Sequence, residues 1–158
     1  MPSAALSIRA YLPTDLDAVI AIFLGAIREI ASKDYNEEQV DAWARVDRQA
    51  WAERRLSRPT WVATLDRASV GFADLEPNGH IDMMFVHPAH QGIGVASGLL
   101  ETVEATAKGQ GIGWLFTEAS ITARPFFEKR GFSVLDSQRV EKRGQLLTNF
   151  RMQKSLSL

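Results

Sequence analysis

Two glycines, Gly92 and Gly94, stand between a segment typical of a β-strand and a segment typical of a helix. Pro88 ends the apolar run from Ile81 to Val86, because proline cannot donate to a sheet ladder. After the glycines, apolar residues recur at helical spacing: Val95, Leu99, Leu100, Val103 and Ala107. Such a turn leaves unpaired backbone N–H groups at the helix start, where the helix dipole adds partial positive charge. The pattern predicts an anion site that suits phosphate.

The composition is typical of a globular protein rather than a fibrous or membrane protein. Its 158 residues suit one domain, 1–158, and 46% of them are apolar while 23% are charged. The chain has no cysteine, which excludes disulfides, thiolate metal sites and a cysteine nucleophile. A net charge of −1 argues against a dedicated nucleic-acid binder.

Nothing in the sequence indicates a membrane segment or a secretion signal. The longest apolar run, Ala18 to Ile27, is shorter than the about 20 residues needed to span a bilayer. The first five residues lack the basic region of a signal peptide. We therefore expect a cytoplasmic protein that contacts neither membranes nor nucleic acid.

Charge is distributed unevenly along the chain. The segment Arg124 to Lys154 carries a net charge of +5, which leaves −6 for the remainder. Six acids lie between Glu29 and Asp47, with only Lys33 and Arg45 of opposite sign. The basic segment suits an anionic cofactor, and the acidic segment suits a cationic substrate. Both are also compatible with ordinary solvated faces.

Hydrophobic periodicity and turn residues predict the elements that position these groups. Strands are expected over 6–12, 61–65, 69–74, 80–86, 114–118, 132–138 and 145–152. Helices are expected over 13–31 with Thr14 as N-cap, 36–44, 47–56, 95–109 and 122–129. The order β-α-α-β-β-β-α-β-α-β-β, with one strand–helix–strand crossover over residues 80–118, predicts a single-domain mixed α/β sheet with helices on both faces.

Three kinds of phosphate-binding loop compete for the glycine pair. A nucleotide P-loop is excluded because no Gly-Lys-Ser/Thr follows. A dinucleotide fold fits G-x-G-x-x-G/A only weakly, since the match begins some 90 residues into the chain and too few strands remain.

The third kind fits best. The hexapeptide Gln91-Gly92-Ile93-Gly94-Val95-Ala96 resembles Q/R-x-x-G-x-G/A, the acetyl-coenzyme A pyrophosphate loop of the GNAT acetyltransferase superfamily. A second block, Ser120 to Phe132, resembles that family's N-x-x-A-x-x-x-Y-x-K-x-G-F segment, and the element order is similar along nearly the whole chain.

This resemblance implies where acetyl-CoA binds. The cofactor would lie in a splay between strands 80–86 and 114–118, paired with the backbone of Phe85 and Val86 as an added strand would be. The backbone of Gln91, Gly92, Ile93, Gly94, Val95 and Ala96 would hold the pyrophosphate. The remaining implied cofactor residues are Ser97 at a phosphate, Ser120 and Ala123 along the pantetheine, Phe126 and Phe127 near the thioester, and Lys129 at the nucleotide end. No metal is expected.

Acetyl transfer to an amine needs a base, because an amine with a pKa of about 10 is mostly charged at pH 7. Strand alternation predicts that Asp82 and His80 share one face beside the glycine loop. Both are at positions where the family relays the proton, so Asp82 is the first candidate base and His80 the second. Glu118 is a third. The alternative for Asp82 is a structural partner of an arginine or a backbone amide.

The chain departs from the family where a tyrosine usually acts as general acid. Phe127 holds that position, and Tyr35, in the loop after the first helix, is the obvious substitute. Alternatively no acid is needed, because a thiol with a pKa of about 8.5 leaves as a thiolate.

These observations predict an N-acetyltransferase that moves the acetyl group of acetyl-CoA to a primary amine by direct, base-assisted attack. The acceptor is a small-molecule amine or a peptide amine, and the protein is a monomer or a homodimer. A protein or peptide N-acetyltransferase and a non-catalytic acyl-CoA sensor are the alternatives. The acidic segment with Tyr35, Trp43 and Trp51 either forms a wall for a cationic amine or packs in the core.

Overall fold

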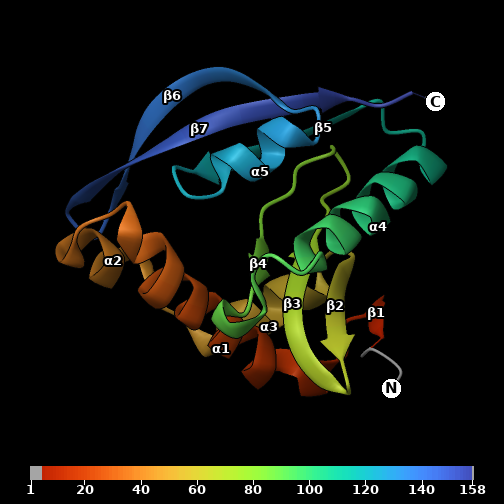
Figure 1. The fold of residues 1–158 in the computed structure, drawn as a ribbon, viewed down its shortest axis with the longest axis horizontal. Coiled ribbons are helices and arrows are strands. Elements are labelled where there is room, and N and C mark those ends of the chain that lie inside the picture. The colour runs from red at the N-terminus through yellow and green to blue at the C-terminus, as the bar shows by residue number, and fades with distance from the viewer. Residues whose placement is uncertain (1–4, 158) are drawn as a thin grey trace.

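The computed structural model describes residues 5–157, which form two sheets that lean against each other (Figure 1). The first sheet has the order β1-β2-β3-β4 and is antiparallel throughout. Its strands are β1 Leu6–Ala10, β2 Thr60–Leu65, β3 Ala68–Asp74 and β4 Met84–Val86. The second sheet, β5-β7-β6, is also antiparallel. Its strands are β5 Trp114–Ser120, β6 Ser133–Lys142 and β7 Gln145–Ser155.

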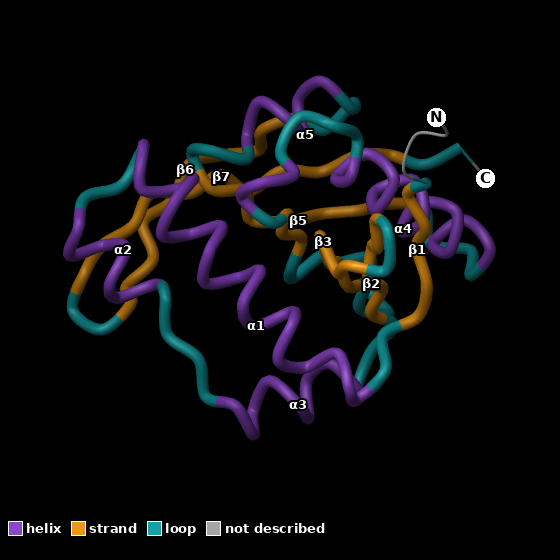
Figure 2. Tube along the Cα trace, turned by 60° about the horizontal axis from the view of Figure 1, so that its bottom comes forward, coloured by secondary structure: helices purple, strands orange, loops and turns teal. Residues whose placement is uncertain are grey.

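Helices cover both faces of the first sheet and build a hydrophobic core on each. The helices are α1 Leu16–Gly25, α2 Glu37–Trp43, α3 Arg48–Leu56, α4 Val95–Gly109 and α5 Arg124–Lys129. On one face Val62 and Phe72 pack with residues of α1 and α3, and on the other Ala63 and Val70 pack with the apolar stripe of α4. Figure 2 shows α1 and α3 together on the first of these faces. The mixed α/β architecture with helices on both faces is confirmed.

The two sheets separate where the sequence predicted a continuous strand. Residues 80–83 form no ladder, and the only parallel contact between the sheets among residues 5–157 is an isolated bridge from His80 to Phe116. Asp74 explains the difference, because its Oδ1 accepts the backbone N–H groups of Asp82 and Met83, each at 2.9 Å. With those donors taken, β4 begins only at Met84, and a splay opens between β4 and β5.

The β6–β7 hairpin lies beside the splay and extends to α2 (Figure 1). Its turn is built on Arg143 and Gly144, which have φ angles of 48° and 84°. The Gln39 side-chain amide of α2 donates to the Leu146 carbonyl at 2.8 Å. The hairpin and α2 therefore enclose the space beside β5.

The N-terminal half follows the predicted helices with two differences. Thr14 is not an N-cap; Asp15 accepts the Leu12 N–H at 2.8 Å and pairs with Arg9. The first helix continues past α1 as a π-helical turn, Ala26–Ile30, and a 3-10 turn, Ala31–Lys33. Asn36 caps the second predicted helix, since its side chain accepts the Gln39 N–H. Within residues 5–157, no helix is long and apolar enough to cross a membrane.

Candidate active site

The splay between β4 and β5 contains a cavity of about 170 Å³, here called the splay cavity. Its walls bring together eight of the residues that the sequence assigned to the cofactor: Phe85, Val86, Gln91, Ala96, Ser120, Ala123, Phe126 and Phe127. The π-helical turn at the end of the first helix contributes Ala26 and Ile30 to the walls. Segments far apart in the sequence thus converge on the predicted cleft.

At one end of the splay cavity, the glycine loop presents a row of unused backbone donors. Among the described residues, the N–H groups of 91–97 have no backbone acceptor, and the first hydrogen bond of α4 is from Gly98 to the Gly94 carbonyl. Gly92 and Gly94 have φ angles of +74° and +91°, in the left-handed region that favours glycine. A Cβ built on either glycine meets no atom within 4 Å, so the space over the loop is open. The donors and the dipole of the 15-residue α4 suit a phosphate group.

Two side chains that the sequence placed in the cofactor site make contacts within the protein. The Gln91 side-chain amide donates to the Val86 carbonyl at 2.9 Å, which ties the loop to the end of β4. The Ser97 hydroxyl accepts a hydrogen bond from Arg130. Arg130 also lies over the Phe126 ring, 4.0 Å from its centroid. With Lys129, Arg130 gives the outer end of the site positive charge, while Lys154 there is paired with Glu104 at 2.6 Å. Arg130 was not among the residues predicted for the cofactor site, although it lies in the basic segment 124–154.

The prediction that Phe85 offers its backbone to the cofactor was wrong. Asp74 N–H donates to Met83 O and His87 N–H donates to Val70 O. Every second residue pair of an antiparallel ladder is hydrogen-bonded, so these two bonds identify which pairs of β3 and β4 exchange hydrogen bonds. In that register Phe85 exchanges both backbone hydrogen bonds with Phe72. The backbone groups that face the splay therefore belong to Met84 and Val86. Phe85 reaches the site through its ring.

A second cavity of about 400 Å³, here called the inner cavity, lies on the far side of the splay from the glycine loop. The two cavities share Trp43, Phe85 and Ser120 in their walls, so they meet at these residues. Asp82 and Glu118 line the inner cavity, and both are exposed. Two of the predicted bases therefore face the same space.

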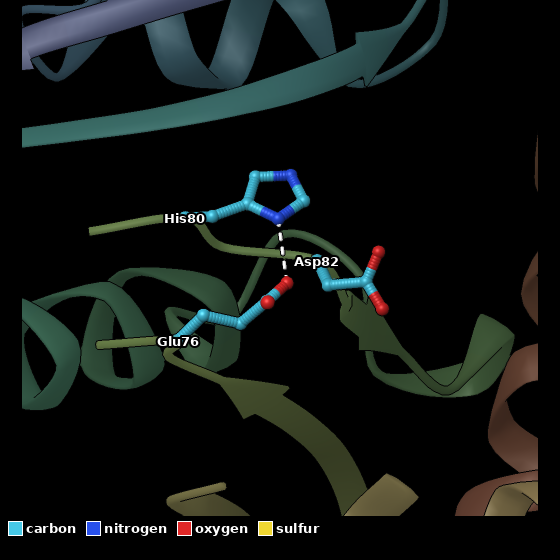
Figure 3. A group of neighbouring side chains, drawn as sticks. All are labelled: Glu76, His80 and Asp82. Atoms are coloured by element: carbon cyan, nitrogen blue, oxygen red, sulfur yellow. Dashed lines mark hydrogen bonds and ion pairs between the residues drawn. The ribbon is translucent and has the colours of Figure 1, made fainter. Parts of the chain in front are cut away.

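His80 does not line the inner cavity but lies behind Glu118. Its Nδ1 is 2.7 Å from Glu76 Oε1 (Figure 3). Its Nε2 is 2.8 Å from Glu118 Oε2. Burial lowers the pKa of His80, but hydrogen bonds and charges of the two carboxylates outweigh burial and raise the pKa to about 9. An imidazole with this pKa already holds its proton at pH 7, which disfavours His80 as the base.

Glu76, His80 and Asp82 offer ligand atoms within 4.8 Å of one another, which is close enough for a metal site (Figure 3). Arg58 supplies the cation in this cluster. Its Nη1 is 3.0 Å from Glu76 Oε1 and 3.5 Å from Asp82 Oδ2. With His80 protonated, the cluster is an ion-pair network whose carboxylates are compensated by the chain itself.

Tyr35 lines the inner cavity, but its hydroxyl is committed to the backbone. It donates to the Thr148 carbonyl at 2.6 Å and accepts the Ile121 N–H at 2.9 Å. Burial raises the pKa of Tyr35, the Ile121 hydrogen bond lowers it, and the nearby Asp34 raises it, with a net increase. A hydroxyl that is bonded in this way and weakly acidic does not suit the predicted role of general acid. Its two hydrogen bonds instead connect the loop after the first helix to Thr148 of the second sheet and to Ile121.

The predicted acidic wall is not present. Among the described residues, the acids of segment 29–47 do not line the inner cavity; the segment contributes Tyr35, Trp43 and Arg45. Trp51, which also lines the cavity, packs edge-on against Phe23 with ring centroids 4.8 Å apart. The aromatic residues thus have the packing role that the sequence left open, and the acids face solvent.

Comparison with known proteins identifies the class of this site. The family model of the acetyltransferase (GNAT) domain matches residues 31–155. The chain is 40% identical over 147 residues to the uncharacterized N-acetyltransferase YafP of Escherichia coli K12, covering 93% of this chain and 94% of that protein. It is 38% identical, with a TM-score of 0.94 and 99% coverage of both chains, to a GCN5-related N-acetyltransferase from Rhodopseudomonas palustris whose description also reads "Aminotransferase, Class-II". PaiA N-acetyltransferase from Thermoplasma acidophilum, solved in complex with coenzyme A, shares the fold at 20% identity with a TM-score of 0.75, over 96% of this chain and 99% of that chain.

Proposed function

The chain belongs to the GNAT acetyltransferase family, and we propose that it transfers the acetyl group of acetyl-CoA to a primary amine by direct attack of the amine. The observation that carries this proposal is the meeting of the two cavities at Trp43, Phe85 and Ser120. One cavity leads to unpaired backbone donors, and the other holds the carboxylates of Asp82 and Glu118. A phosphate-bearing acyl donor and an amine can therefore approach each other from opposite sides.

The residues of the splay cavity fit acetyl-CoA by their chemistry. The N–H groups of 91–97 and the α4 dipole suit the pyrophosphate, and the open space over Gly92 and Gly94 allows it to approach the backbone. Arg130 and Lys129 add positive charge toward the nucleotide end. The open edge of β4 offers the backbone groups of Met84 and the N–H of Val86 to the amides of the pantetheine, while the Val86 carbonyl already accepts from Gln91. Bound acetyl-CoA supplies a thioester whose carbonyl carbon accepts a neutral amine.

Asp82 is the best candidate for the base. Its backbone is fixed by Asp74, and the shortest cation contact of its carboxylate is 3.5 Å, to Arg58. Both carboxylate oxygens of Glu118 are already engaged by His80 Nε2, at 3.1 Å and 2.8 Å. In the proposed step the Asp82 carboxylate takes the amine proton, directly or through water, the N–C bond forms, and the C–S bond breaks.

No side chain is required to protonate the leaving thiol. Phe127 has no hydroxyl, and the Tyr35 hydroxyl donates to Thr148. A thiol with a pKa of about 8.5 is a tolerable leaving group as the thiolate, which takes its proton from solvent. The proposed chemistry thus uses one base and no general acid.

Thiol release from acetyl-CoA with a panel of amines tests the proposal, with mass spectrometry of the acetylated product. Calorimetry of acetyl-CoA binding is run on the same preparation. Turnover of at least one amine, small or peptidyl, is the expected result. Micromolar binding without any thiol release would instead assign the protein as an acyl-CoA sensor.

A further inference from the structure

We infer that the acceptor is a zwitterion, a small molecule that carries an anionic carboxylate or phosphonate group in addition to its amine. This inference rests on the proposed function and specifies its second substrate. It comes from the charged side chains that line the inner cavity, because they include four basic residues and only two acids. The six are Asp82, Glu118, Arg45, Arg54, Lys142 and Arg143.

The acids and the bases come from different ends of the inner cavity. Glu118 lies on β5 near Ser120, which pairs with Asn149 of β7. Asn149 in turn pairs with Gln138 of β6, and Lys142 follows four residues later on the same strand. Four residues of β-strand extend about 13 Å. The carboxylates thus lie beside the junction with the splay cavity, while Lys142 lies at the hairpin tip.

Lys142 points into the cavity as a consequence of strand alternation. Gln138, Val140 and Lys142 all line the inner cavity, while Arg139 and Glu141 between them do not. This period of two means that Lys142 shares the inward face of the hairpin. Its side chain is half-buried, so its charge is directed at whatever occupies the cavity.

None of the four cations has an acidic partner among residues 5–157, and two of them also lack a side-chain hydrogen bond to the protein. Arg143 donates to the Ala42 carbonyl at 2.6 Å and Arg45 donates to the Asp41 carbonyl at 3.0 Å. Both arginines thus hydrogen-bond to carbonyl groups in the last turn of α2. Across residues 5–157, no carboxylate lies within 4.0 Å of the charged groups of Arg54 or Lys142. By contrast, Asp82 and Glu118 already face Arg58 and His80. The unbalanced charge of the cavity is therefore positive.

A neutral polar group completes the amine end. Asn149 Oδ1 is buried in the cavity wall and accepts no hydrogen bond from the described residues. A buried acceptor without a donor is unfavourable, so a ligand that brings an N–H to this position is favoured. An amine near Asn149, Asp82 and Glu118 with an anion toward Lys142 or Arg54 satisfies all of these groups. A purely cationic amine leaves the two cations opposed to it.

The test measures kcat/KM for thiol release with matched acceptors that differ only in the anionic group. Each proteinogenic L-amino acid is compared with its carboxamide, 4-aminobutyrate with its amide, and 2-aminoethylphosphonate with ethylamine. For the substrate with the highest kcat/KM, we expect the anionic form to exceed its neutral partner by about tenfold or more, since a charged hydrogen bond in a cavity is worth at least that factor. Equal or better turnover of the neutral or cationic partners would overturn the inference and leave the proposed function standing.

Variants identify the side chains that hold the anion. Lys142→Gln and Arg54→Gln are expected to raise KM for the anionic substrate several-fold and to leave KM for its neutral partner unchanged. Arg139→Gln is the matched control, because Arg139 lies on the outer face of the same strand and should change neither KM. If neither Lys142→Gln nor Arg54→Gln changes the preference, the inference is wrong. If no acceptor gives thiol release although acetyl-CoA binds, the proposed function fails first and the inference fails with it.

Discussion

Arg55 and Asp74 form an ion pair in which both side chains are fully buried, with Nη2 and Oδ2 3.0 Å apart. Burial lowers the pKa of Arg55 and raises the pKa of Asp74, while the charge of each partner opposes the change in the other. The other carboxylate oxygen of Asp74 holds the N–H groups of Asp82 and Met83. The pair therefore fixes the segment that carries the proposed base, at the point where β4 leaves β5.

Asp74→Asn is expected to destabilise the protein strongly, because it leaves the buried Arg55 charge without a counter-ion. Breaking one partner of a buried pair costs about 3 to 5 kcal/mol of unfolding free energy. Urea unfolding at pH 7 measures it. Asp136→Asn is the matched control, since Asp136 forms an exposed pair with Arg151 at 2.7 Å and should lose little stability. Equal losses for the two variants would show that the buried pair has no special role.

Gly94→Glu is expected to abolish acetyl-CoA binding, because it places a carboxylate among the donors meant for the pyrophosphate. Gly111→Glu is the control, since Gly111 also has positive φ, +73°, and open space around its Cβ. Both variants carry the same backbone strain, about 1 to 2 kcal/mol. Calorimetry should show binding lost in Gly94→Glu alone. An unchanged Kd for Gly94→Glu would contradict the assignment of the loop.

Asp82→Asn should lower kcat/KM far more at pH 7 than at pH 9. At pH 7 nearly all of the amine is protonated and needs the base, whereas at pH 9 a larger fraction is already neutral. The pH dependence of kcat/KM for both proteins measures the difference. Glu118→Gln serves as the comparison and should give the smaller loss at pH 7. The same factor of loss for Asp82→Asn at both pH values would exclude Asp82 as the base.

Local patterns in the sequence predicted the glycine loop and α4 correctly, because the turn at Gly92 and Gly94 and the apolar spacing of the helix are set by neighbours in the chain. The same reasoning failed over His80 to Met83. There the side chain of Asp74, eight residues before Asp82, removes the donors that a ladder needs. Only the folded chain brings that carboxylate to those amides.

The prediction of the charge around the acceptor was wrong for a similar reason. Charges counted along the sequence assigned the acidic segment 29–47 to the substrate. In the structure that segment turns its carboxylates to solvent, and the cavity takes its cations from α3 and from the tip of the β6–β7 hairpin. Lys142 and Arg54 are 88 positions apart in the sequence, so no local pattern joins them.

His80 should titrate with a pKa near 9, which ¹H–¹³C NMR of its ring can follow directly. A folded-state pKa raised above 6.5 means that the ion pairs of His80 stabilise the protein fully below pH 6.5 and lose this contribution as the pH rises through about 9. With solvent screening, the loss should be about 1 to 2 kcal/mol between pH 6.5 and 10. His80→Gln should not show this component of the pH dependence. A pKa near 6.5 in the wild type would restore His80 as a candidate base.

Tyr35→Phe separates a structural tie from a general acid. Removing the hydroxyl leaves the Thr148 carbonyl and the Ile121 N–H without their partner, which costs about 1 to 3 kcal/mol of unfolding free energy. We expect kcat to stay within about threefold of the wild type, since loss of a true general acid or base typically costs about 10² to 10⁴. Tyr11→Phe is the control, because the Tyr11 hydroxyl bonds none of residues 5–157 and its loss should be small. A hundredfold fall in kcat with unchanged stability would identify Tyr35 as the acid after all.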